Sequence, residues 1–155
     1  MKTVILSLCA LVCFASQSKA RIGETLEQCI QRYGAVVKQE SGIIVFKKSG
    51  FFVMVKLYNE KVEQIAFCKA QADELGQAGA ISDNEIELLL KTNGGASNWK
   101  VQPVISTDRH WQTEDESLFA HYTTIDHMLV IQTKDCVVRD IESEKAKEKQ
   151  NLNSF

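Results

Sequence analysis

Three histidines are the residues of this chain best suited to metal binding or acid–base chemistry: His110, His121 and His127. The segment between His121 and His127 is typical of a turn joining two antiparallel strands. Across such a turn the two imidazoles would face each other with Asp126 nearby, and both side-chain types are zinc ligands. The same spacing is typical of two solvated histidines. A small metal-dependent or hydrolytic enzyme around His121, His127 and Asp126 is therefore kept as an alternative function.

Other catalytic patterns are missing from the sequence. It contains no G-x-S-x-G, no H-E-x-x-H, no P-loop and no G-x-G-x-x-G. Asn93-Gly-Gly95 is rich in glycine, but it follows an expected helix and is typical of a helix end rather than a phosphate cradle. We assign no catalytic residue, metal ligand or cofactor from sequence, and the main hypothesis is a non-catalytic protein.

The cysteines indicate at most one disulfide in the mature chain. Cys9 and Cys13 lie in the first twenty residues, which leaves Cys29, Cys68 and Cys136, with no C-x-x-C pair among them. If a disulfide forms, Cys29 with Cys68 is favoured, because both lie in the same half of the chain. The apolar neighbours of Cys29 at helical spacing also fit a buried free thiol, so both readings stay open.

The first twenty residues have the pattern of a secretory signal peptide. Lys2 supplies the positive start, an apolar run of about twelve residues follows, and Ser18 and Ala20 fit the cleavage site before Arg21. The run is shorter than the roughly 18 residues that a membrane span needs. We therefore expect an exported protein, periplasmic or extracellular, without a stable membrane anchor.

Length and charge narrow the range of functions further. The chain has 155 residues, of which 45% are apolar and 25% charged, as expected for one folded domain. Its net charge of −2 becomes −4 once Lys2 and Lys19 are removed with the signal. No basic excess is present to neutralise phosphates, which argues against nucleic acid as a partner.

The first half of the mature chain, residues 21–69, is predicted to form a helix followed by antiparallel hairpins. Thr25 and Gln28 form a capping box, and the helix is expected to end at Tyr33, before Gly34. Three short apolar runs joined by polar turns follow. They cover Ile43 to Lys47, Phe51 to Tyr58 and Val62 to Phe67.

The second half, residues 81–140, is expected to repeat this plan after a linker at 70–80. Ser82 and Glu85 form another capping box, with strands predicted around Trp111 and at 118–123 and 128–133. Residues 141–155 have no apolar face and are expected to form a solvated, charged tail. The predicted fold is α+β: two helix-plus-antiparallel-hairpin repeats, with both helices packed on one face of an antiparallel sheet.

The face that the helices leave uncovered is the predicted binding surface. Period-two alternation turns Val53, Val55 and Leu57 inward. Aromatic residues and methionine are enriched in protein interfaces, so we expect a partner, another protein of unknown identity, on the outward residues. The predicted contact residues are Phe52, Met54, Lys56, Tyr58, Phe119 and His121.

The segment from Gly23 to Gly34 resembles the G-x-T-x-x-x-V-x-x-x-x-G helix that opens the small β-lactamase-inhibitor-like fold. Secreted β-lactamase inhibitor proteins contain two copies of this fold, and the outer-membrane assembly lipoproteins (SmpA/OmlA) contain one. The chain is also similar to uncharacterised exported bacterial proteins with an R-I-G-E-T start. The resemblance implies a binding role and a small α+β domain, in tandem as in the inhibitors. The chain departs from the lipoproteins in lacking a lipidation cysteine, and from the inhibitors in lacking a disulfide for each copy.

Overall fold

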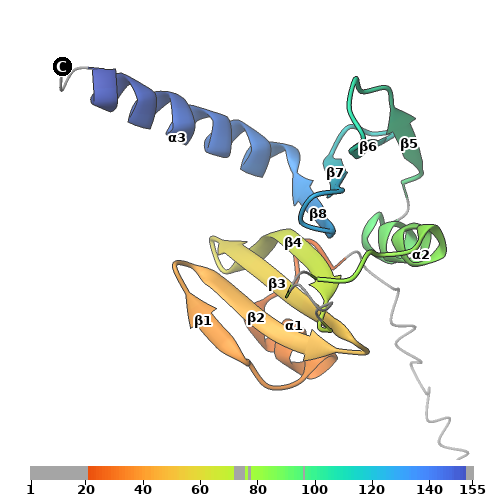
Figure 1. Cartoon of the computed structure of the whole chain (residues 1–155). Coiled ribbons are helices and arrows are strands. Elements are labelled where there is room, and N and C mark those ends of the chain that lie inside the picture. The colour runs from red at the N-terminus through yellow and green to blue at the C-terminus, as the bar shows by residue number, and fades with distance from the viewer. Residues whose placement is uncertain (1–20, 72–75, 77, 96, 153–155) are drawn as a thin grey trace, which may run out of the picture.

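The computed structural model describes residues 21–71, 76, 78–95 and 97–152, and Figure 1 shows the arrangement of their helices and strands. The predicted signal peptide at 1–20 and residues 153–155 of the predicted tail lie outside the described residues. The elements in chain order are α1 (Leu26–Tyr33), β1 (Lys38–Glu40), β2 (Ile43–Lys48), β3 (Phe51–Tyr58), β4 (Lys61–Lys69), α2 (Asp83–Asn93), β5 (Trp99–Gln102), β6 (Arg109–Thr113), β7 (Leu118–Thr123), β8 (Met128–Thr133) and α3 (Lys134–Leu152).

All eight strands belong to one antiparallel sheet in the order β1-β2-β3-β4-β8-β7-β6-β5. Each of β1 to β4 pairs with its neighbour in sequence, and so does each of β5 to β8. The two four-strand groups join where β4 pairs with β8, for example through Ile65 opposite Ile131. The prediction of an α+β fold with an antiparallel sheet is confirmed.

Helices α1 and α2 pack on the same face of the sheet, and the hydrophobic core lies between them and the strands. Cys29 and Tyr33 of α1, and Ile86 and Leu90 of α2, are buried there. Burying a large aliphatic side chain stabilises the fold by about 1.5–3 kcal/mol. The strand residues buried on this face are Ile44, Phe46, Val53, Val55, Ile65, Phe67, Trp111, Ala120, Tyr122, Leu129 and Ile131.

Both helices begin as the sequence predicts. At the start of α1, the Gln28 N–H donates to the Thr25 hydroxyl and the Thr25 N–H donates to the Gln28 side chain. At the start of α2, both the N–H and the hydroxyl of Ser82 donate to the Glu85 carboxylate. These bonds satisfy donors that have no partner within a helix, which fixes where each helix starts.

The C-terminal segment differs from its prediction. Residues beyond Asp140 are helical to Leu152 and continue α3, which projects away from the sheet (Figure 1). Residues 141–151 are exposed, so the segment is solvated as expected but is a helix rather than a frayed tail. Alanine, glutamate and lysine have high intrinsic helix propensity, which favours helix without an apolar face.

Two strands were not expected from the sequence. β1 has three residues, all exposed, and β5 has four, of which Lys100 and Val101 are exposed, Val101 by 74%. They are the edge strands of the sheet.

The predicted linker connects β4 to α2, and its residues 72–75 and 77 lie outside the described residues. No helix in the described part of the chain is long and apolar enough to cross a membrane.

Candidate binding surfaces

The side of the sheet opposite α1 and α2, here called the second face, carries the residues that the sequence singled out. Most of its residues belong to two rows of register partners, each with one residue per strand. The first row is Lys38, Val45, Met54, Ala66, Val130, His121, His110 and Gln102. The second row is Glu40, Ile43, Lys56, Gln64, Gln132, Phe119, Gln112 and Lys100.

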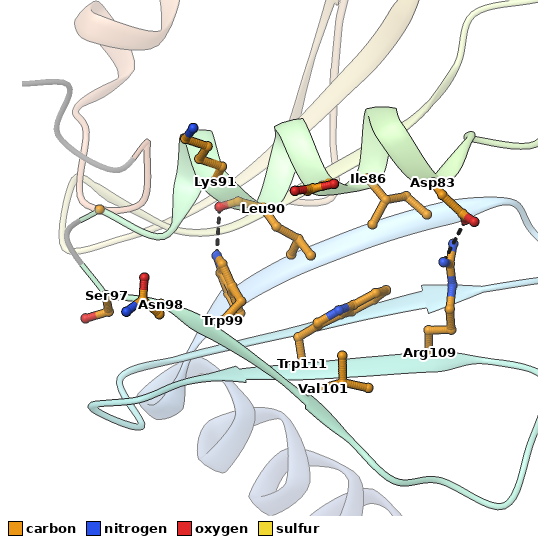
Figure 2. Close-up of a pocket in the computed structure, with 12 residues that line it drawn as sticks. Asp83, Ile86, Leu90, Lys91, Ser97, Asn98, Trp99, Val101, Arg109 and Trp111 are labelled. Atoms are coloured by element: carbon orange, nitrogen blue, oxygen red, sulfur yellow. Dashed lines mark hydrogen bonds and ion pairs between the residues drawn. The ribbon is translucent and has the colours of Figure 1, made fainter.

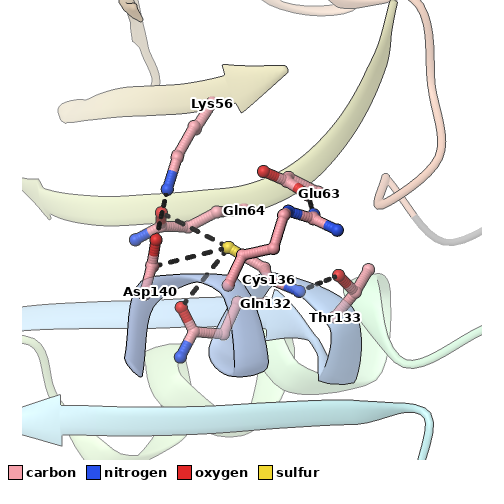
Figure 3. A network of polar contacts seen from close by, with 8 residues as sticks. Lys56, Glu63, Gln64, Gln132, Thr133, Cys136 and Asp140 are labelled. Carbon is pink, nitrogen blue, oxygen red and sulfur yellow. Dashed lines mark hydrogen bonds and ion pairs between the residues drawn. The ribbon is translucent and has the colours of Figure 1, made fainter. Parts of the chain in front are cut away.

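The beginning of α3 covers the middle of the second row (Figure 3). The buried Cys136 thiol lies 4.0 Å from the side-chain oxygens of both Gln64 and Gln132, and 3.7 Å from Oδ2 of Asp140. One turn further on, Oδ1 of Asp140 accepts from Lys56 Nζ at 2.7 Å. Desolvation by burial raises the pKa of the Cys136 thiol to about 11, so it is protonated at neutral pH and can donate to these oxygens.

Arg139 makes the other contact between α3 and the sheet. Its guanidinium forms an ion pair with Glu63, whose side chain is only 8% exposed. Lys56 pairs with Gln64 and Leu57 pairs with Val62, so Glu63 is the extra residue of a β-bulge. The same guanidinium lies over the ring of Tyr58, with its central carbon 3.8 Å from the ring centroid.

The predicted contact surface is therefore divided into two parts. Lys56 and Tyr58 contact α3, so they belong partly to the protein's own packing. The remaining predicted residues, Phe52, Met54, Phe119 and His121, are partly exposed on the second face. Between them, Ala66 and Val130 are only 6% and 3% exposed.

The structure does not bring His121, His127 and Asp126 together as the alternative function requires. His121 faces His110 across β6 and β7, with ring centroids 5.9 Å apart. His127 instead approaches the Tyr122 hydroxyl, with its Nδ1 3.3 Å from that oxygen. Tyr122 follows His121 in β7, and adjacent residues of a strand point to opposite faces. His127, which contacts Tyr122, therefore lies on the helix side of the sheet, away from His121. In the described part of the chain, no group of three or more His, Cys, Asp or Glu residues is arranged to hold a metal ion.

The favoured disulfide between Cys29 and Cys68 is wrong for this structure, because the three described cysteines are free thiols. Cys29 is buried between α1 and the sheet, whereas Cys68 pairs with Phe52 on the second face. The sheet separates the two side chains. Burial raises the pKa of Cys29 to about 11, and the Glu24 carboxylate adds to this shift. The alternative interpretation of Cys29 as a small buried residue fits this position.

A pocket between α2 and strands β5 and β6 was not expected from the sequence (Figure 2). It has a volume of about 530 Å³, and its apolar lining includes Trp99, Trp111, Ile86 and Leu90. Pockets of this size commonly accept small ligands. The two tryptophans, twelve positions apart on different strands, are the sequence signal that would have pointed to it, once β5 was recognised.

Hydrogen bonds and ion pairs fix the walls of this pocket. The Trp99 indole N–H donates to the Leu90 carbonyl at 2.7 Å, which ties β5 to the end of α2. At the other end, Arg109 binds Asp83 at 2.8 Å, and its guanidinium carbon lies 5.5 Å from the Trp111 ring centroid. Asp83 is 87% exposed, so this ion pair contributes little to stability.

No family model matches the sequence, and no curated protein is significantly similar to it. Distant structural likeness is found to solved structures. A cysteine-rich secretory protein from Staphylococcus aureus subsp. aureus Mu50 is 12% identical to this chain, with a TM-score of 0.41. The match covers 75% of this chain and 46% of that protein. A DUF4309 family protein (YjgB) from Bacillus subtilis subsp. subtilis str. 168 is 11% identical, with a TM-score of 0.40. The match covers 72% of this chain and 79% of that protein.

An extracellular protein containing an SCP domain from Bacillus anthracis str. Ames is 12% identical, with a TM-score of 0.39, 87% of this chain covered and 52% of the other. The chain thus spans about half the length of the staphylococcal and anthrax proteins. Likeness at this level assigns the chain to none of these families. The resemblance of the segment from Gly23 to Gly34 to the β-lactamase-inhibitor-like fold stays a prediction.

Proposed function

We propose that this protein is an exported, non-catalytic binding module that recognises another protein with the second face of its sheet. The observation that carries the proposal is the partly exposed set Phe52, Met54, Phe119 and His121, beside the part of the face that α3 covers. We call this set the apolar patch. The patch is partly exposed, and the contacts of α3 include Lys56, Tyr58, Glu63, Gln64, Gln132, Glu116 and Ser117, which lie beside it.

The composition of the apolar patch supports a protein partner. A sheet face that meets only water usually carries Lys, Glu and Thr, whereas aromatic residues and methionine are enriched in interfaces. Ala66 and Val130 form a nearly buried floor between the exposed side chains. A well-packed apolar centre with a polar surround is the arrangement in which a few side chains supply most of the binding free energy.

Export is part of the same proposal and rests on the sequence. The short apolar run and Ala20 support cleavage before Arg21. Mass spectrometry of the protein recovered from outside the cytoplasm should give a chain that begins at Arg21. Recovery of a chain with Met1 intact would contradict export through a cleaved signal.

We also infer that the domain arose by duplication of a helix followed by four strands. The sheet order supports this, because β1 to β4 and β5 to β8 form two consecutive meanders joined through their last strands. Each meander follows a helix with a capping box, Thr25 with Gln28 in α1 and Ser82 with Glu85 in α2. Separate expression of residues 21–69 and 81–140 as associating fragments would test the inference, and failure to associate would count against it.

Capture of the partner by immobilised protein tests the binding proposal. The chain from Arg21 to Phe155 would be exposed to the native envelope or medium, beside the double variant Phe52→Ser/Phe119→Ser. Leu88 and Ile125 are 64% and 82% exposed elsewhere on the molecule, so Leu88→Ser/Ile125→Ser is the matched control. We expect the patch variant to weaken capture about 30-fold or more, and the control to leave capture unchanged.

Equal capture by both double variants would contradict the proposal. A large fall in melting temperature of the patch variant, measured by circular dichroism, would show that Phe52 and Phe119 stabilise the fold and would also argue against a free binding surface. Neither outcome bears on the export prediction, which mass spectrometry of the mature chain tests separately.

A further inference from the structure

His110 and His121 form a cross-strand pair on the second face. They are register partners in the antiparallel pair β6 and β7, their ring centroids are 5.9 Å apart, and their rings are inclined by 31°. Both side chains are partly buried. The sequence alone does not pair His110 with His121, because the ten residues between them hide the register of the two strands.

The separation of the two rings is close to that of two imidazole ligands on one metal ion. With metal–nitrogen distances of about 2.0–2.1 Å and tetrahedral angles, the centroids of two coordinated rings lie about 5 Å apart. The observed separation exceeds this by less than about 1 Å, which small side-chain rotations remove. The strands hold both backbones, so most of the entropy cost of bringing two ligands together is already met by the fold.

We propose that His110 and His121 together bind one divalent transition-metal ion, each through one imidazole nitrogen, with water completing the coordination. Imidazole suits Cu²⁺, Ni²⁺ and Zn²⁺, whereas Mg²⁺ and Ca²⁺ prefer oxygen ligands. The order of affinities expected for such a site is Cu²⁺ above Ni²⁺ and Zn²⁺.

The surroundings of His121 favour the neutral form of its imidazole. Burial lowers the pKa of His121, the neighbouring His110 lowers it further, and Asp108 partly opposes the shift. A neutral ring is the form that binds a metal, so this shift is in the direction that a metal ligand needs. Asp108 accepts from the N–H and hydroxyl of Thr124, so it is placed as a nearby negative charge. The other register partners of the pair, Gln102 and Val130, are uncharged.

Isothermal titration of the mature chain with NiCl₂ and ZnCl₂ at pH 7.5 tests the proposal. We expect one ion per chain, with a dissociation constant below about 100 µM. His110→Gln and His121→Gln, which keep the size of the side chain, should each weaken binding at least tenfold. His127→Gln is the matched control, since His127 contacts Tyr122 on the other side of the sheet, and it should change the affinity less than twofold.

Cys68→Ser is a second control, because a partly exposed thiol is another transition-metal ligand. Affinity that falls with Cys68→Ser but not with His121→Gln would overturn the proposal, and so would no heat of binding at 100 µM metal. Two-dimensional NMR of the imidazole signals gives an independent readout: Zn²⁺ should shift the resonances of His110 and His121 and leave those of His127 in place. The metal site does not depend on the binding of a partner protein.

Discussion

The guanidinium carbon of Arg139 lies 3.8 Å from the centroid of the Tyr58 ring, and the same guanidinium pairs with Glu63. Arg139 belongs to the helix that follows the last strand, whereas Tyr58 and Glu63 flank the turn between β3 and β4. The contact joins the end of the chain to its first half. Tyr58, which the sequence predicted to contact a partner protein, therefore contacts the protein's own C-terminal helix.

Replacing Arg139 should destabilise the fold through Glu63. The Glu63 side chain is 8% exposed, and Arg139→Ala leaves its carboxylate without the compensating charge. Removing one partner of a buried ion pair lowers the unfolding free energy by more than the intact pair contributes to it, because a buried charge is left unpaired. Since Arg139 is partly exposed, we expect a loss of about 2–3 kcal/mol in unfolding free energy. Urea denaturation measures it. Lys134→Ala, which removes an exposed ion pair to Glu116, is the control and should cost less than about 0.5 kcal/mol; equal losses would contradict the assignment.

The three cysteines should react with iodoacetamide in an order set by exposure. Cys29 and Cys136 are buried and their thiol pKa is raised to about 11 by burial, so almost no thiolate is present at pH 8. Cys68 is partly exposed and should be labelled first in the native protein. Peptide mapping before and after unfolding in urea checks this order. A peptide in which Cys29 is bridged to Cys68 would contradict the separation of these residues by the sheet.

Gly94→Ala should disturb the pocket wall. A Cβ at Gly94 would lie 2.4 Å from Nε1 and 3.1 Å from Cδ1 of Trp99, so the indole would have to leave its position against the Leu90 carbonyl. We expect a loss of about 1–3 kcal/mol in unfolding free energy and a change in tryptophan fluorescence. Gly79→Ala is the matched control because its Cβ meets only ordinary contacts. Unchanged fluorescence in Gly94→Ala would show that Trp99 does not pack there.

The start of α2 should lose stability in acid. Hydrogen bonding to Lys69 and to the Ser82 N–H lowers the pKa of Glu85 to about 2 in the folded state, from 4.5. Because the folded pKa is below the unfolded one, the stabilisation is complete above pH 4.5 and is lost as the pH falls towards 2. Glu85→Gln should therefore destabilise the protein at pH 6 and approach the wild type at pH 2, as measured by urea denaturation. A difference from the wild type that is independent of pH would contradict this origin.

The elements with strong local signals could be predicted from the sequence. Two capping boxes located α1 and α2, and alternating apolar residues located β3 and β7, with Val53 and Ala120 on the buried side. These patterns depend on neighbours within a few residues, which is why a single sequence contains them.

The edge strands and the C-terminal helix could not be predicted in the same way. β1 is Lys-Gln-Glu and is fully exposed, so nothing in it alternates. α3 has no apolar stripe beyond its first turns, and its contacts with the sheet rest on Cys136, Arg139 and Asp140. Those contacts join residues about 70 to 85 positions apart, and their partners are set by the sheet order rather than by local pattern.

The candidate site was predicted only in part for the same reason. Alternation along β3 correctly placed Phe52 and Met54 on the side away from Val53. It gave no information on which strand lies beside which. The pairing of His121 with His110 instead of His127, and the position of Trp99 beside α2, both depend on that order.

Site-specific photo-crosslinking in the organism of origin tests the central proposal most directly. A benzophenone side chain would replace Met54 or Phe119 on the apolar patch, and Leu88 or Ile125 as exposed controls on other surfaces. We expect both patch positions to give the same adduct with one other protein, identified by mass spectrometry, and the controls to give none. Adducts formed only from Leu88 or Ile125, or no adduct from either patch position, would contradict binding through the second face of the sheet.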